Sequence, residues 1–148
     1  MRLVRNRKVK LLEQLPLFHG CSDADLEYVA KLARDVRFDD GTTLLCQGTA
    51  GDEFFLLVEG GANVVADGRT IAHIRAGDYC GEIALLERIN RTATVVAVGP
   101  VRTLVLHEPD FHAMLEAIPG LRARVSSAAF ERLAHHAPQP STDAPDHV

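Results

Sequence analysis

Two strand-like regions of this chain are joined by residues 77–95, Gly-Asp-Tyr-Cys-Gly-Glu-Ile-Ala-Leu-Leu-Glu-Arg-Ile-Asn-Arg-Thr-Ala-Thr-Val. Residues 82–86 predict a helix of little more than one turn, whose backbone N–H groups largely lack internal acceptors and can bind an anion. Arg91, nine residues after Glu82, adds a planar fork of donors suited to a phosphate. Glu82 would repel a purely anionic ligand, so it indicates a ligand that also offers hydroxyl groups.

A phosphate next to a free sugar hydroxyl meets both demands, and a cyclic nucleotide is such a ligand. The run Gly81-Glu82-Ile83-Ala84-Leu85-Leu86, followed by Arg91-Thr92-Ala93-Thr94-Val95, resembles the phosphate-binding cassette of cyclic nucleotide-binding domains. That family includes catabolite-activator-type regulators, regulatory subunits of cyclic-AMP-dependent kinase and nucleotide-gated channels. The resemblance extends over roughly residues 11–136.

The resemblance also implies the roles of the site residues. Arg91 would bind the phosphate, and Glu82 would accept a hydrogen bond from the ribose 2′-hydroxyl. The remaining positions would act mostly through backbone N–H groups; they are Gly81, Ile83, Ala84 and Thr92. Because threonine at the last of these is often associated with guanine contact, cyclic GMP joins cyclic AMP as a candidate ligand, with cyclic AMP preferred. The competing interpretations are structural: a surface or structural arginine for Arg91, an acid that suits the helix dipole for Glu82, and plain core packing for Ile83.

In this family the last helix closes over the base. Candidates for that contact here are Arg124, Phe130 and Arg132, where an arginine would stack by a cation–π interaction. The sequence leaves the choice among them open, because helix surface or core packing explains each one equally.

Upstream and downstream of the cassette, short strand-like runs alternate with Gly, Asp and Asn. We expect strands near 35–38, 43–46, 53–59, 62–66, 69–75, 92–98 and 101–107. Many short strands in succession predict an antiparallel β-roll, a double-stranded jelly roll. Asp67-Gly68 indicates a hairpin turn between two of the strands. Residues 53–59 alternate in such a way that one face is expected to form core.

Helical periodicity brackets the strands, so the fold class is mainly β with flanking helices. Ser22 is typical of an N-cap for a helix over about 22–34. Two C-terminal helices are expected, one after Pro109 and one from Pro119 to about His136. We divide the chain into a basic N-terminal segment (1–10), a cyclic nucleotide-binding domain (11–136) and a disordered tail (137–148).

Composition excludes several classes of protein. The 148 residues suit one domain, and the net charge of −4 argues against non-specific binding to duplex DNA. The expected last helix is followed by few residues and no helix-turn-helix, so we expect no direct DNA binding. No apolar run is long enough for a transmembrane segment. The three cysteines are odd in number and far apart, as in reduced thiols. We therefore expect a cytoplasmic protein.

Catalytic and metal-binding motifs are not recognisable in the sequence. The seven histidines show no ligand spacing, and His73-Ile74-Arg75 breaks the His-x-His pair that a cupin roll requires. Nucleophile elbows and Walker loops are missing as well. We expect no enzyme, no metal and no cofactor, but a sensor that binds cyclic AMP or cyclic GMP and passes its occupancy through the C-terminal helices to an unknown protein partner. The alternative is a ligand-free β-roll that serves in protein interaction or dimerisation.

Overall fold

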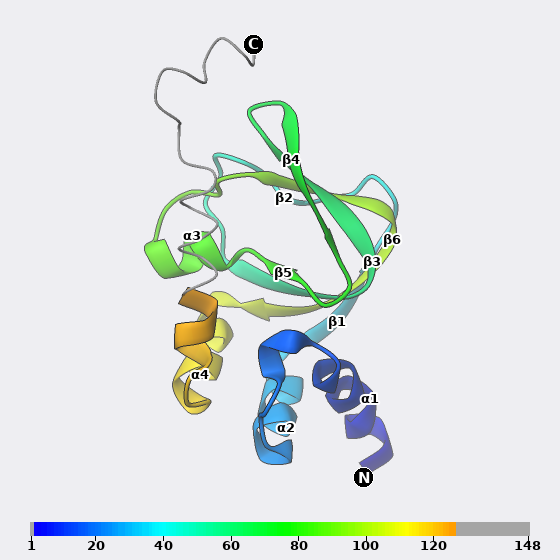
Figure 1. Ribbon diagram of the computed structural model, residues 1–148, viewed down its shortest axis with the longest axis vertical. Helices are drawn as coiled ribbons and strands as arrows, with labels where there is room; N and C mark the ends of the chain where they lie inside the picture. The colour runs from blue at the N-terminus through cyan, green and yellow to red at the C-terminus, as the bar shows by residue number, and fades with distance from the viewer. Residues whose placement is uncertain (1, 127–148) are drawn as a thin grey trace.

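The alternating strands of the sequence form an antiparallel roll in the computed structural model, which describes residues 2–126. Within that range the strands are β1 (Arg34–Phe38), β2 (Thr43–Leu45), β3 (Glu53–Ala66), β4 (Arg69–Arg75), β5 (Tyr79–Cys80) and β6 (Thr94–His107). They form one six-stranded sheet in the order β1-β6-β3-β4, with β2 paired to β6 and β5 to β3. Figure 1 shows this roll standing on a layer of helices. The predicted fold class is confirmed.

Two pairs of predicted strands are continuous, which corrects our expectation of separate strands. The runs at 53–59 and 62–66 are both part of β3, and residues 94–98 of one later run are continuous with 101–107 in β6, which begins two residues after the predicted start at 92. The β3–β6 register shifts between Leu57 and Gly61. Gly60 has φ +88°, and a Cβ there would lie 2.3 Å from the carbonyl oxygen of Pro100. Glycine therefore lets the strand bend closely against its neighbour without ending it.

The first part of β3, over residues 54–57, is buried on both faces, whereas we predicted one core face. Phe54 and Leu56 belong to the core between the roll and the helices. Phe55 and Leu57 belong to a second core inside the roll. A rolled sheet covered by helices has apolar contacts on each side, so the alternation marks two cores. The hairpin prediction is correct, because Asp67 and Gly68 have φ +53° and +81° and connect β3 to β4.

The helical layer is built from both ends of the described chain. Its elements are α1 (Arg2–Glu13), the 3₁₀ turn η1 (Pro16–Phe18), α2 (Asp23–Leu32), α4 (Glu108–Ala117) and a helical segment over 121–126. Ser22 caps α2 as predicted, accepting a hydrogen bond from the backbone N–H of Asp25 at 3.1 Å. The helix predicted over 119–136 lies partly outside the described residues.

Helix α1 continues through the position between residues 10 and 11, where we placed the start of the domain. Val9 is buried in the core, and Lys8 Nζ donates to the carbonyls of Ala30 and Ala33 at 3.1 and 2.7 Å. A cation at the C-terminus of α2 is favoured by the helix dipole and satisfies its last carbonyls. The end of the basic segment is therefore packed onto α2.

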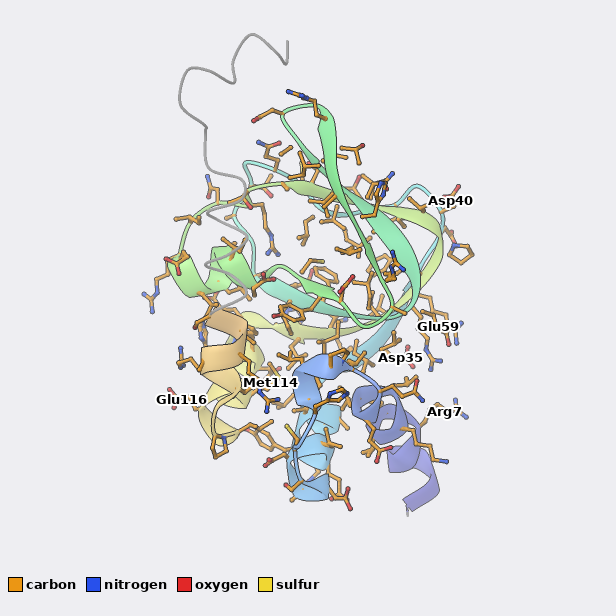
Figure 2. The ribbon with its side chains drawn as sticks, in the orientation of Figure 1. Arg7, Asp35, Asp40, Glu59, Met114 and Glu116 are labelled. Atoms are coloured by element: carbon orange, nitrogen blue, oxygen red, sulfur yellow. The ribbon has the colours of Figure 1, made fainter. Side chains whose placement is uncertain are left out.

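One ion-pair network joins β1, β3 and β6 on the outside of the roll. Arg102 on β6 donates to Asp35 on β1 at 2.7 Å and to Glu59 on β3 at 3.2 Å, and Figure 2 shows these two carboxylates on the same side of the roll. The hydrogen bond from Arg102 holds the pKa of Asp35 below its usual range, and the two carboxylates raise the pKa of Arg102. The network therefore connects β3 to β6 at Glu59, next to the bend at Gly60.

Candidate functional site

The short helix α3 (Glu82–Glu87) leaves the roll directly after β5. Gly81 at its N-cap has φ +97°, and Arg88 at its C-cap has φ +56°. A Cβ on Gly81 would lie 2.7 Å from the carbonyl oxygen of Glu53 and 3.1 Å from Nη1 of Arg91. Only glycine satisfies both the left-handed backbone and this close approach. Figure 1 shows α3 at one side of the roll.

Arg91 lies beside this N-cap and is buried, with 7% of its surface exposed. Its Nη1 donates to the carbonyl of Gly81 at 3.0 Å, and its Nη2 donates to the carbonyl of Glu53 at 2.9 Å. The two carbonyls come from the start of α3 and the start of β3, so they fix the plane of the guanidinium between these elements. A guanidinium held in one plane is prepared to bind a phosphate through two hydrogen bonds.

The charge of Arg91 is balanced by its surroundings. Burial lowers the pKa of the guanidinium, while Cys80, Asp52, Glu53 and Glu82 raise it by electrostatic attraction. An arginine remains protonated through the physiological range even when its pKa falls. The site therefore holds a fixed positive charge where water has little access, and such a charge interacts strongly with an anion.

The remaining predicted site residues are Glu82, Ile83, Ala84 and Thr92, and most of them are buried. Glu82 is fully buried, and Ile83 and Ala84 are exposed by 7% and 6%. Thr92 is half-buried and follows Arg91 in the bend that precedes β6. Since Ile83 and Ala84 contribute to the first turn of α3, their backbone N–H groups lie at the helix start. A buried carboxylate here calls for hydrogen-bond donors.

The loop over 46–52 forms the other wall of the site, and our sequence interpretation missed it. The backbone N–H of Arg91 donates to the carbonyl of Thr49 at 2.8 Å, and the N–H of Gly48 donates to the carbonyl of Arg91 at 2.9 Å. Gly51 lies directly against the Arg91 side chain. The signal in the sequence was the Gly51-Asp52 pair directly before the strand that begins at Glu53.

The structure gives Arg124 a contact other than the predicted one with a base. Its Nη1 donates to the carbonyls of Leu17 and His19 at 2.7 and 3.0 Å. These bonds tie the helical segment over 121–126 to η1 at the other end of the chain. The other candidates for contact with the base, Phe130 and Arg132, lie outside the described residues.

The described part of the chain holds neither a metal-binding cluster nor a helix that could cross a membrane. Residues 2–126 contain no group of three His, Cys, Asp or Glu side chains that could hold a metal ion. Over the same range, every helix is too short or too polar to cross a membrane.

The chain is similar to known proteins over the region that forms this site. A family model described as "Cyclic nucleotide-binding domain" matches residues 35–117, which include β1 through α4. A curated relative, the cAMP-dependent protein kinase regulatory subunit of Schizosaccharomyces pombe, is 30% identical over 106 residues. The match covers 71% of this chain and 26% of that protein, so the chain spans about a quarter of its relative's length.

Solved structures agree with the sequence matches. The regulatory domain of Toxoplasma gondii PKA with cAMP superposes with a TM-score of 0.78 at 27% identity, over 86% of this chain and 50% of that one. A structure described as "Sp-2Cl-cAMPS bound to PKAR CBD2" gives 0.76 at 26% identity, over 88% and 92% of the two chains. A regulatory subunit of a cAMP-independent protein kinase A from Trypanosoma brucei gives 0.79 at 22% identity, over 88% and 49%, which shows a shared fold alone.

Proposed function

The chain belongs to the cyclic nucleotide-binding domain family, and we propose that it is a sensor that binds cyclic AMP in preference to cyclic GMP. Its family relatives include the Toxoplasma gondii domain solved with cAMP. The observation that carries the proposal is the buried guanidinium of Arg91, whose plane is fixed at the N-cap of α3 by two carbonyls. A fixed cation beside the backbone N–H groups of a helix start suits one phosphate.

The phosphate of the nucleotide is bound by Arg91 and by backbone N–H groups of the first turn of α3. Gly81, Ile83 and Ala84 supply these groups, and Thr92, which follows Arg91, adds its own. The small side chains at positions 81 and 84 leave the backbone accessible, while Ile83 anchors the turn in the core. A cyclic phosphate carries a single negative charge, which the guanidinium neutralises.

The ribose is recognised by Glu82. Its carboxylate is fully buried, and a buried carboxylate accepts hydrogen bonds strongly because water does not compete for it. In our proposal it accepts from the ribose 2′-hydroxyl. This contact distinguishes a ribonucleotide from a deoxyribonucleotide, whereas the Arg91 contact does not.

Occupancy of the site is passed to a protein partner through the helical layer. Arg124 connects the segment over 121–126 to η1, so the two ends of the described chain respond as one unit. A ligand shifts this layer only to the extent that it binds one arrangement better than the other. The chain itself carries out no chemical step in this proposal, and its output is a change of surface.

Thermal unfolding with added nucleotides tests the function. A ligand at a hundred times its dissociation constant stabilises a protein by about 2.7 kcal/mol, which raises the unfolding midpoint by several degrees in a domain of this size. We expect a clear increase with cyclic AMP, a smaller one with cyclic GMP at equal concentration, and none with 5′-AMP. The last control has the same base and sugar but an open, doubly charged phosphate.

The same measurement separates this function from the alternative. A midpoint that none of the nucleotides moves would contradict the sensor and favour a ligand-free β-roll that docks or dimerises. The neighbour from Trypanosoma brucei, described as belonging to a cAMP-independent kinase, makes this comparison worthwhile, because the fold by itself does not fix the ligand.

A further inference from the structure

Gly51 and Arg91 are forty residues apart in the sequence, yet they touch in the structure. A Cβ built on Gly51 would lie 2.0 Å from Nε, 2.1 Å from Cζ and 2.6 Å from Nη2 of Arg91. Real carbon atoms do not approach these atoms so closely, so a larger residue at 51 forces something to move. Because Gly51 has no side chain, it provides the space that the guanidinium occupies.

The guanidinium is the group that moves when this space is filled. The loop cannot retreat on its own, because Thr49 accepts from the backbone N–H of Arg91 at 2.8 Å and Gly48 donates to its carbonyl at 2.9 Å. The end of an arginine side chain, by contrast, is flexible. Displacement would break its bonds to the carbonyls of Gly81 and Glu53, while the backbone fold persists.

The backbone of Gly51 does not itself require glycine. Nine other glycines in the described chain have φ between +74° and +102°, and Gly51 is not among them. An alanine at 51 therefore fits the backbone, and its effect comes from the contact with Arg91. This separates Gly51 from Gly48, where φ is +86° and an added Cβ meets nothing within 4 Å.

We propose that Gly51 is a positioning residue that sets nucleotide affinity by holding the guanidinium of Arg91 in its binding plane. The proposal rests on the function proposed above. In this proposal the loop over 46–52 supports the phosphate site from behind Arg91. The loop acts on the nucleotide through Arg91 and not by direct contact.

The test is a double-mutant cycle on the full chain, measured by calorimetry with cyclic AMP. Gly51→Ala is expected to raise the dissociation constant about 10- to 100-fold, which corresponds to the loss of one charge-assisted hydrogen bond. In an Arg91→Ala background, the same substitution is expected to change the constant by no more than about twofold. In the ligand-free protein, the side-chain Nε–H resonance of Arg91 is expected to shift in Gly51→Ala.

Gly61→Ala is the matched control. Gly61 also lacks a positive φ, and its added Cβ would lie 3.0 Å from the carbonyl oxygen of Ile74, far along β3 from the site. This variant is expected to unfold at lower denaturant concentration yet to bind cyclic AMP as the wild type does. A loss of affinity from general destabilisation would affect both variants.

Two results with the single variant overturn the role of Gly51 and leave the sensor function untouched. They are a Gly51→Ala variant that binds like the wild type, and one whose Arg91 resonance does not shift. A Gly51→Ala effect that persists in the Arg91→Ala background also overturns it, since the glycine would then act without the arginine. Absence of binding by the wild-type chain is a separate outcome, which rejects the sensor function and the affinity claim with it.

Discussion

Replacement of Arg91 by lysine keeps the charge of the site and removes its geometry. The arginine donates from two different nitrogens, to Gly81 at 3.0 Å and to Glu53 at 2.9 Å. Lysine has one nitrogen on a flexible stem and can replace at most one of these bonds in the same position. A hydrogen bond from a charged donor contributes about 1.5–3 kcal/mol, so the ligand-free protein is expected to lose about that much stability.

The expected loss of affinity is larger than the loss of stability suggests. If the fork gives two charge-assisted bonds to the phosphate, losing their alignment removes about 3–6 kcal/mol of binding free energy at most. Each 1.4 kcal/mol is a factor of ten, and lysine retains the charge, so we expect the dissociation constant for cyclic AMP to rise about a hundredfold or more. Titration calorimetry measures this constant, and urea unfolding without ligand measures the stability.

Arg88→Lys serves as the control for this experiment. Arg88 is exposed at the C-cap of α3, three residues from Arg91. The same substitution there measures the effect of replacing a nearby arginine by lysine without changing the guanidinium of the site. It should leave both the affinity and the unfolding midpoint close to those of the wild type. Equal affinity of Arg91→Lys and wild type would refute the reasoning, because the planar fork would then have no part in binding.

Three further predictions concern the ribose, acid stability and the helical layer. Removing the 2′-hydroxyl of cyclic AMP should weaken binding about tenfold in the wild type and much less in Glu82→Gln, and calorimetry that finds no difference in the wild type would reject the ribose contact. Because Arg102 holds the pKa of Asp35 below its usual range, the stability that this ion pair contributes is fully present above about pH 4 and is lost as the pH decreases further. Asp35→Asn should therefore flatten the pH dependence of the unfolding free energy in acid. An unchanged slope would argue against a stabilising role of the Asp35 carboxylate. Arg124→Ala removes two hydrogen bonds to carbonyls at η1 and should speed amide exchange in the segment after α4. Arg122→Ala, on an exposed side chain, should not. Equal exchange rates in the two variants would contradict the proposed connection between this segment and η1.

The prediction of local structure succeeded where neighbouring residues determine it. Ser22 caps α2 because its side chain reaches a backbone N–H three residues later. The Asp67-Gly68 turn fixes β4 at 69–75, the range predicted from the sequence. Errors arose where the chain is bent without being interrupted, since the glycines at 60 and 61 look like a turn in the sequence but continue β3 through a register shift.

The sequence by itself determined the roll, the short helix after β5 and the spacing of Glu82 and Arg91, because turn residues, strand periodicity and the cassette pattern are all short-range features. Only the tertiary structure decided which carbonyls hold the guanidinium, that Gly51 backs it, and that Arg124 contacts η1. Each of these contacts joins residues that are far apart in the chain, as between Arg91 and Glu53 or Arg124 and Leu17. Two of them use backbone carbonyls, which every residue possesses, and the third uses a missing Cβ. The identity of a residue therefore does not predict such a partner, because the contact depends on how the folded chain brings the two segments together.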